Sequence, residues 1–130
     1  MLYASIVAGG ALGAVGREWL SDAFPSAFPW MTLAINVAGS FLIVFALELG
    51  EYLHTHYVGF HAVGFCGGFT TFSTFSLQTL GLWQEGETGA AVLYVFLSVA
   101  LCLLAVWLAL KMTHRLRRPP EPVGMEEEIG

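Results

Sequence analysis

Charged side chains are scarce in this sequence. Among its 130 residues, Lys and Arg number five and Asp and Glu number ten, so 12% of the chain is charged. Soluble globular domains carry roughly twice that fraction, because their surfaces face water. Disorder is also excluded, since disordered chains are poor in apolar residues, whereas 56% of this chain is hydrophobic. The composition therefore favours an integral membrane protein.

Basic residues and cysteines are fewer still. The formal net charge is −5, and basic residues gather only near the C-terminal end, which argues against nucleic-acid binding. Cys66 and Cys102 lack the spacing of a disulfide framework or a metal site. We expect both cysteines to be small packing residues.

Long stretches without ionised side chains predict where the chain crosses a membrane. A helix needs about 20 apolar residues to cross about 30 Å of hydrocarbon. The predicted spans cover residues 2–21, 30–52, 59–82 and 88–111. They form one all-helical transmembrane domain, residues 1–112, in which short loops make neighbouring spans antiparallel. Residues 113–130 form a polar tail that we expect to be disordered.

The basic residues predict an orientation. One side of the membrane would hold Lys111, Arg115, Arg117 and Arg118, and the other side only Arg17. Basic segments stay in the cytoplasm, so we expect both termini there.

Small residues recur on the first predicted span. Ser5, Gly9 and Gly13 follow at intervals of four and so share one helical face. Such a face lets two helix backbones approach closely. The sequence leaves open whether the partner helix belongs to the same chain or to a second copy, although so small a chain favours oligomerisation.

Polar side chains inside the spans need partners, because an unpaired polar group in hydrocarbon is costly. Thr32 and Asn36 share a face of the second span, and Tyr94 and Ser98 share a face of the fourth. The Asn36 carboxamide can join two helices or coordinate a permeating species, and the residues alone favour joining. The hydroxyl stripe alone is more typical of packing or of back-bonding to the helix.

The third span has an unusual centre. The glycine pair Gly67 and Gly68 is followed by alternating hydroxyl and aromatic residues, a pattern of weak helical propensity. We predict a break near Gly67 and Thr70, whose freed carbonyl oxygens could coordinate a cation. Phe72 and Phe75 share one face beyond the break. Their positive ring edges could attract an anion, or the rings could simply pack.

Three stretches resemble the signature stretches of the Fluc fluoride channels, also called CrcB proteins, in order and spacing. They are GGALGAVGRE at residues 9–18, TLAINVAGSF at residues 32–41 and GFCGGFTTFSTFS at residues 64–76. The third stretch is the most specific, and the resemblance covers about residues 1–112.

The resemblance implies a multi-pass protein of the inner membrane that forms an antiparallel, dual-topology dimer. Members of this family are not enzymes. They export fluoride passively through two pores per dimer and so protect microbes from its toxicity. A structural sodium ion at the dimer centre would be held by the backbone carbonyls of Gly67 and Thr70.

The resemblance also assigns the pore. Asn36 would take the place of the family's pore asparagine, and the ring edges of Phe72 and Phe75 would meet fluoride. Arg17 would lie near the vestibule. Further hydroxyl groups along the pathway would belong to Thr32, Ser73, Thr74, Tyr94 and Ser98. Fluoride is tightly hydrated, so a selective path must replace its water with such donors.

Dual insertion is easiest for a chain without a basic bias, and this tail carries one. We expect a homodimer, with an oppositely inserted homologue as the alternative partner.

Two other functions compete with a channel. A proton-coupled exporter would need a carboxylate inside the membrane, but Glu18 and Glu48 lie near span ends. A non-transporting assembly subunit would explain the glycine stripe but not the polar break. A metal site has little support. Three histidines lie around one loop, but no carboxylate or thiol cluster joins them in the sequence: His54, His56 and His61.

Overall fold

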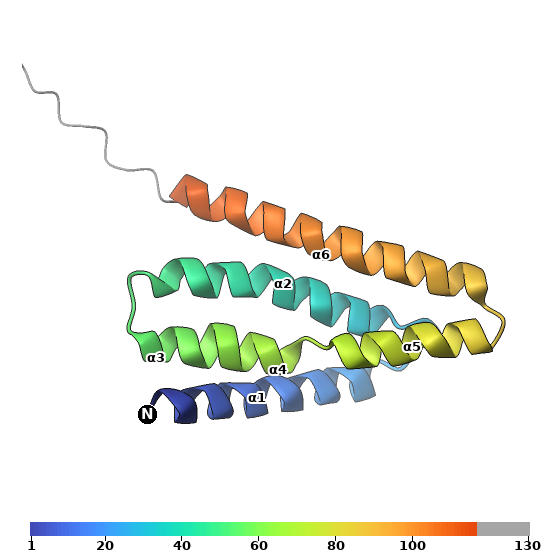
Figure 1. Ribbon diagram of the computed structural model, residues 1–130, viewed down its shortest axis with the longest axis horizontal. Coiled ribbons are helices and arrows are strands. Elements are labelled where there is room, and N and C mark those ends of the chain that lie inside the picture. Colours follow the sequence, from blue (N-terminus) through green and yellow to red (C-terminus); the bar gives the residue numbers. More distant parts are fainter. Residues whose placement is uncertain (117–130) are drawn as a thin grey trace, which may run out of the picture.

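The computed structural model describes residues 1–116, and every regular element in that range is a helix. The helices lie roughly alongside one another as long rods (Figure 1). In chain order they are α1 (Leu2–Ala23), α2 (Trp30–Gly50), α3 (Thr55–Val58), the π-helix η1 (Gly59–Cys66), α4 (Gly67–Phe69), α5 (Phe72–Gln84) and α6 (Thr88–Leu116). Because α3, η1 and α4 follow without interruption and α5 continues after two residues, the chain forms four rods.

Two of these rods have the length and apolarity of membrane-spanning helices. Helices α2 and α6 are each long and apolar enough to cross a membrane. At 1.5 Å per residue, the 21 residues of α2 extend about 32 Å. Helix α1 is as long but carries Arg17, Glu18 and Asp22 in its last two turns, and α5 alone has only 13 residues.

The far end of α6 differs from the prediction. The helix continues to Leu116, so residues 113–116 are helical and not part of a disordered tail. Thr113 is buried there, and its hydroxyl donates to the carbonyl of Leu110 at 2.9 Å. Polar composition alone therefore did not mark the helix end. The rest of the predicted tail, residues 117–130, lies outside the described residues.

Helix α1 packs against η1 and α4 along its glycines. A Cβ added at Gly9 would lie 2.9 Å from the backbone nitrogen of Phe65, and one added at Gly13 would lie 2.8 Å from that of Phe69. From the other side, a Cβ on Gly68 would collide with the backbone of Gly10. These contacts form a glycine seam inside one chain, between α1 and the third rod.

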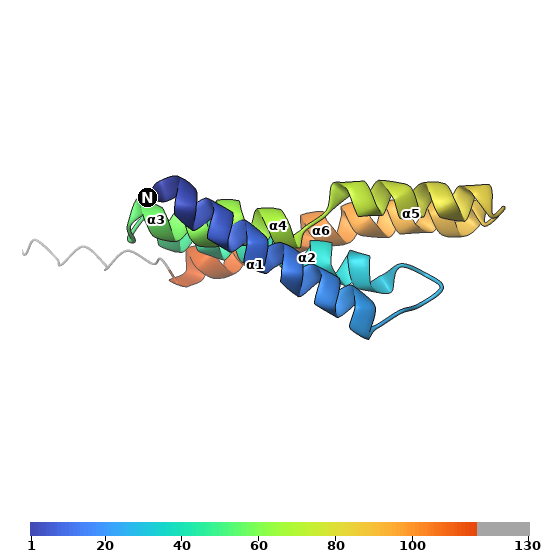
Figure 2. The same ribbon diagram turned by 90° about the horizontal axis from the view of Figure 1, so that it is seen from below.

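The third rod changes neighbours at its break. Figure 2 shows α4 beside α1, whereas α5 lies over α6. Helix α6 also packs along α2 and tilts away from it toward its C-terminal end (Figure 1). The break thus lies where the rod leaves α1 and comes to lie on α6, with α2 in contact on both sides of it.

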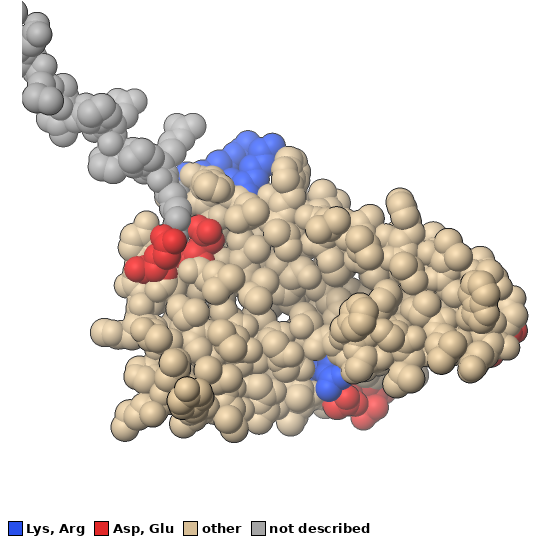
Figure 3. Space-filling view, viewed as in Figure 1, with Lys and Arg blue, Asp and Glu red and all other residues tan. Residues whose placement is uncertain are grey.

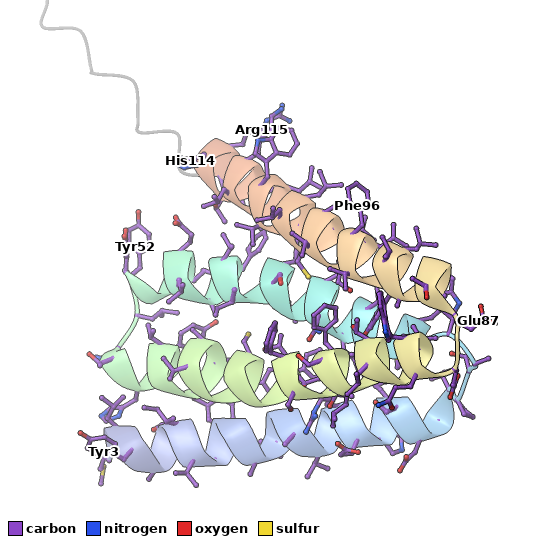
Figure 4. The ribbon with its side chains drawn as sticks, turned by 45° about the vertical axis from the view of Figure 1, so that its right-hand side comes forward. Tyr3, Tyr52, Glu87, Phe96, His114 and Arg115 are labelled. Atoms are coloured by element: carbon purple, nitrogen blue, oxygen red, sulfur yellow. The ribbon has the colours of Figure 1, made fainter. Side chains whose placement is uncertain are left out.

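Large apolar side chains cover much of the outside of the bundle. Leu12, Trp19 and Phe96 are among many that are more than half exposed, and Figure 4 shows Phe96 pointing outward from α6. Charged side chains lie toward the two ends of the helices, with an uncharged band between them on the face shown in Figure 3. Such a surface suits hydrocarbon better than water.

Candidate functional site around the helix break

The break lies at Thr70 and Thr71, immediately after the glycine pair. Both residues have extended backbones, with φ −78° and ψ 156° at Thr70 and φ −147° and ψ 120° at Thr71. The Thr70 hydroxyl donates to the carbonyl of Cys66 at 2.9 Å. The Thr71 hydroxyl accepts from the backbone N–H of Thr74 at 3.1 Å and so caps the start of α5. Each threonine closes one of the two broken helix ends.

Asn36 holds the break from α2. Its Nδ2 donates to the carbonyl of Thr71 at 3.0 Å, and its Oδ1 accepts from the N–H of Thr71 at 2.8 Å. One side chain thus satisfies both backbone groups of a residue that has left the helical ladder, where an unpaired group would be costly. The Asn36 carboxamide joins two helices, as its position inside a span suggested.

Several carbonyls lose their usual donors at the break, those of Gly67 and Thr70 among them. In an unbroken helix the N–H of Thr71 would bond to Gly67, and the N–H of Thr74 would bond to Thr70. Here the first N–H bonds to Asn36 and the second to the Thr71 hydroxyl. The carbonyl oxygens of Gly67 and Thr70 are therefore released from the ladder, and neutral oxygens of this kind suit a hard cation such as sodium.

A groove of about 360 Å³ runs beside the break and is open on one side. Phe72 and Phe75 line it, with ring centroids 5.6 Å apart, and Phe72 is 80% exposed. Ser98 faces it from α6. Its hydroxyl is buried and has no hydrogen-bond partner among residues 1–116. A buried hydroxyl without a partner is costly, so the site is suited to a ligand that would accept a hydrogen bond from it.

A smaller hollow of about 240 Å³ lies on the other side of Thr71, which lines both. Arg17 lines this hollow. Its Nη1 donates to the Thr74 hydroxyl at 3.5 Å, and its Nη2 lies 3.3 Å from a carboxylate oxygen of Glu18. Gln78 also lines it and accepts from the hydroxyl of the fully buried Tyr94 at 2.9 Å. The hollow is thus polar and carries one guanidinium paired with one carboxylate.

Most of the predicted site residues gather at these two hollows. The groove is lined by Asn36, Gly67, Thr70, Phe72, Phe75 and Ser98. The smaller hollow is lined by Arg17, Thr32 and Thr74. Ser73 is exposed, and its hydroxyl lies 3.3 Å from that of Thr71. Tyr94 packs against Phe75, with ring centroids 5.2 Å apart. Gly9 and Gly13 lie apart from both hollows, in the glycine seam.

A family model described as CrcB-like protein, camphor resistance (CrcB), matches residues 4–110. The chain belongs to the CrcB-like family. This confirms the family indicated by the three sequence stretches.

Relatives with a functional name support the same assignment. The chain is 49% identical over 117 residues to the "Fluoride-specific ion channel FluC" of Paramagnetospirillum magneticum, a match that covers 83% of this chain and 91% of the relative. The protein of the same name from Rhodospirillum rubrum is 48% identical over 117 residues, which again cover 83% of this chain and 91% of the relative. The one from Thermus thermophilus is 43% identical over 118 residues, covering 85% of this chain and 91% of the relative.

Sequence reasoning about this CrcB-like chain missed two parts of the site. Gln78 was not singled out, although it follows Thr74 by four residues and so shares its helical face. The pairing of Asn36 with the backbone of Thr71 was also missed. Cys66 and Cys102, both free thiols, line the groove from separate helices.

Proposed function

We propose that this protein is a fluoride channel that lets fluoride leave the cell passively across the inner membrane and so confers resistance to it. The name shared by its relatives supports the ion, and channels of this family catalyse no reaction. One observation carries the proposal for this chain. The broken third rod brings an amide, two phenylalanine rings and an unpartnered hydroxyl to one groove without any ionised side chain.

The proposed membrane arrangement has four spans. Helices α2 and α6 supply two of them by length and apolarity. The rod from α3 to α5 and helix α1 supply the others, because the rod packs against α2 and α6, α1 packs along the rod, and both expose large apolar side chains. Backbone irregularity within the third span is tolerated because Asn36 bonds to both backbone groups of Thr71 and the Thr71 hydroxyl accepts from the N–H of Thr74, while the released carbonyls of Gly67 and Thr70 are left for a cation.

The proposed path runs from the smaller hollow past Thr71 into the groove. The guanidinium of Arg17, which is paired with Glu18, offers N–H donors at the entrance, and Thr32 and Thr74 offer hydroxyl donors. Beyond Thr71, fluoride would meet the edges of Phe72 and Phe75. Ser73, Tyr94 and Ser98 supply further hydroxyl groups along the way. Sites built from neutral donors bind an anion weakly enough to release it, which conduction requires.

The open side of the groove favours a second copy of the chain. Helix α5 has no fully buried residue, and Phe72 is 80% exposed beside a polar break. An antiparallel copy laid over this side would close the groove and, by symmetry, create two equivalent pores. It would also bring the Gly67 and Thr70 carbonyls of both chains together around one sodium ion. The partner is another copy or an oppositely inserted homologue.

The experiment that tests the function is fluoride efflux from liposomes holding the purified protein. A fluoride electrode should record rapid loss driven by a membrane potential, with negligible chloride loss. A pH gradient alone should drive none, because no proton is exchanged.

The pore assignment is tested in the same assay by Phe75→Ile, which removes a ring from the groove. Fluoride efflux should fall by at least about tenfold, the effect of losing one contact of about 1.4 kcal/mol at the barrier. Phe96→Ile is the matched control, since Phe96 points outward from α6 (Figure 4) and should leave efflux unchanged. Equal chloride and fluoride loss, or full efflux from Phe75→Ile, would overturn the assignment.

A further inference from the structure

The last three turns of α6 carry a stripe of one aromatic and two basic residues. Trp107, Lys111 and Arg115 follow at intervals of four, so they share one helical face. All three are exposed. The Lys111 ammonium lies 4.7 Å from the centroid of the Trp107 ring, a cation–π contact that holds the cation beside the aromatic face.

The stripe begins where the apolar part of α6 ends. Residues 88–110 carry no ionised side chain, and 23 residues of helix extend about 35 Å, slightly more than the hydrocarbon layer. Trp107 would therefore lie at the boundary of the hydrocarbon, where tryptophan is enriched. Lys111 and Arg115 follow about 6 Å and 12 Å further along the axis, at the depth of lipid phosphates.

The surroundings leave the two cations free for an outside partner. Within residues 1–116, neither Lys111 nor Arg115 is within ion-pair distance of a carboxylate. Figure 3 shows their basic patch rising from the end of α6, separated from the acidic patch on the same face. Figure 4 shows Arg115 pointing away from α2.

We propose that Trp107, Lys111 and Arg115 form a binding site for the headgroup of an anionic phospholipid. The ammonium of Lys111 supplies a point charge, and the fork of Arg115 can donate two parallel N–H bonds to phosphate oxygens. The Trp107 ring packs against the glycerol and upper acyl region, with its indole N–H available to an ester oxygen. This site rests on the proposed membrane-spanning function, because only a membrane brings phosphates to this depth.

The test follows thermal unfolding of the full chain in detergent while phosphatidylglycerol is added, with phosphatidylcholine as the neutral comparison. Phosphatidylglycerol should raise the melting temperature and phosphatidylcholine should not. In Lys111→Gln/Arg115→Gln, half-maximal stabilisation should need at least about tenfold more phosphatidylglycerol. An unchanged melting temperature of this variant in phosphatidylcholine shows that it is folded.

Two controls locate the site. Arg117→Gln/Arg118→Gln removes the same charge beyond the described helix and should keep most of the stabilisation. Lys111→Arg keeps the charge and should keep it fully. Equal stabilisation by both lipids, or an equal loss in Arg117→Gln/Arg118→Gln, would overturn the site. Equal stabilisation by inorganic phosphate would show a site for free anions and overturn the lipid assignment.

Fluoride efflux measured on the same preparation separates this proposal from the channel function. Efflux without selective stabilisation by phosphatidylglycerol would reject the lipid site alone. Selective stabilisation without efflux would reject the channel function alone.

Discussion

The two halves of the third rod are packed in opposite ways. Before the break, η1 and α4 lie so close to α1 that Gly9, Gly13 and Gly68 have no room for a Cβ. After the break, α5 has no fully buried residue, and Phe72 is largely exposed. The first half finds its packing partner, α1, within the same chain. The second half presents an exposed face and an open groove that a second chain could cover. Close packing is thus concentrated in the seam, whereas the proposed ion path lies at the groove.

The largest effect should come from filling the seam. Gly13→Leu forces a side chain against the backbone of Phe65 and Phe69, which cannot move without separating α1 from the third rod. We expect a loss of about 3 kcal/mol or more in the free energy of unfolding. Gel filtration and thermal unfolding in detergent measure this. A fully folded Gly13→Leu with an unchanged melting temperature would show that the seam is not the tight half.

An intermediate effect should come from the two hydrogen bonds between the Asn36 side chain and the backbone of Thr71, at the break between the two halves. Asn36→Asp keeps an acceptor for the N–H of Thr71 but loses the donor to its carbonyl. It also adds a negative charge beside the groove. We expect a destabilisation of about 1–3 kcal/mol and a much larger relative loss of fluoride efflux. Gln84→Glu makes the same amide-to-carboxylate change at an exposed position and should alter neither. Parental efflux from Asn36→Asp would contradict the pore assignment.

A purely functional effect should come from the groove itself. Ser98→Ala removes a buried hydroxyl that has no hydrogen-bond partner in the described part of the chain, so the melting temperature should stay the same or rise slightly. Fluoride efflux should nevertheless fall several-fold, because a donor is lost from the path. Ser76→Ala is the matched control, since the Ser76 hydroxyl bonds to the carbonyl of Phe72 on its own helix. A lower melting temperature with normal efflux in Ser98→Ala would show that this hydroxyl stabilises the fold and does not serve fluoride passage.

The smallest effect tests how local the seam is. Gly16 lies on α1 only three residues beyond Gly13, yet a Cβ there would meet nothing within 4 Å. Gly16→Ala should stabilise the protein by up to about 1 kcal/mol through helix propensity alone. Thermal unfolding compared with Gly13→Ala measures the difference. Equal destabilisation by both changes would mean that the whole face of α1 is packed tightly.

Sequence analysis predicted the features that depend on local chemistry. The helical character follows from apolar stretches, and the break follows from a glycine pair and four hydroxyl residues within a few positions. The family followed from three contiguous stretches. The four spans, the dimer, the sodium ion and the pore roles stay predictions.

The features it missed depend on distant contacts. Asn36 and Thr71 are 35 residues apart, so no local pattern shows that one clamps the other. Periodicity placed Gly9 and Gly13 on one face but could not identify η1 as the partner. The end of α6 was predicted too early because the polar composition of residues 113–116 does not show that Thr113 is buried.

The break also has an electrical consequence. A helix carries roughly half a negative charge at its C-terminal end and half a positive charge at its N-terminal end. The segment from α3 to α4 ends at Phe69, and α5 begins at Phe72, so two opposite poles face each other across two residues. A cation on the carbonyl side and an anion on the N–H side would each be attracted by backbone dipoles. The middle of the chain can thus attract ions of either sign while carrying no net charge of its own.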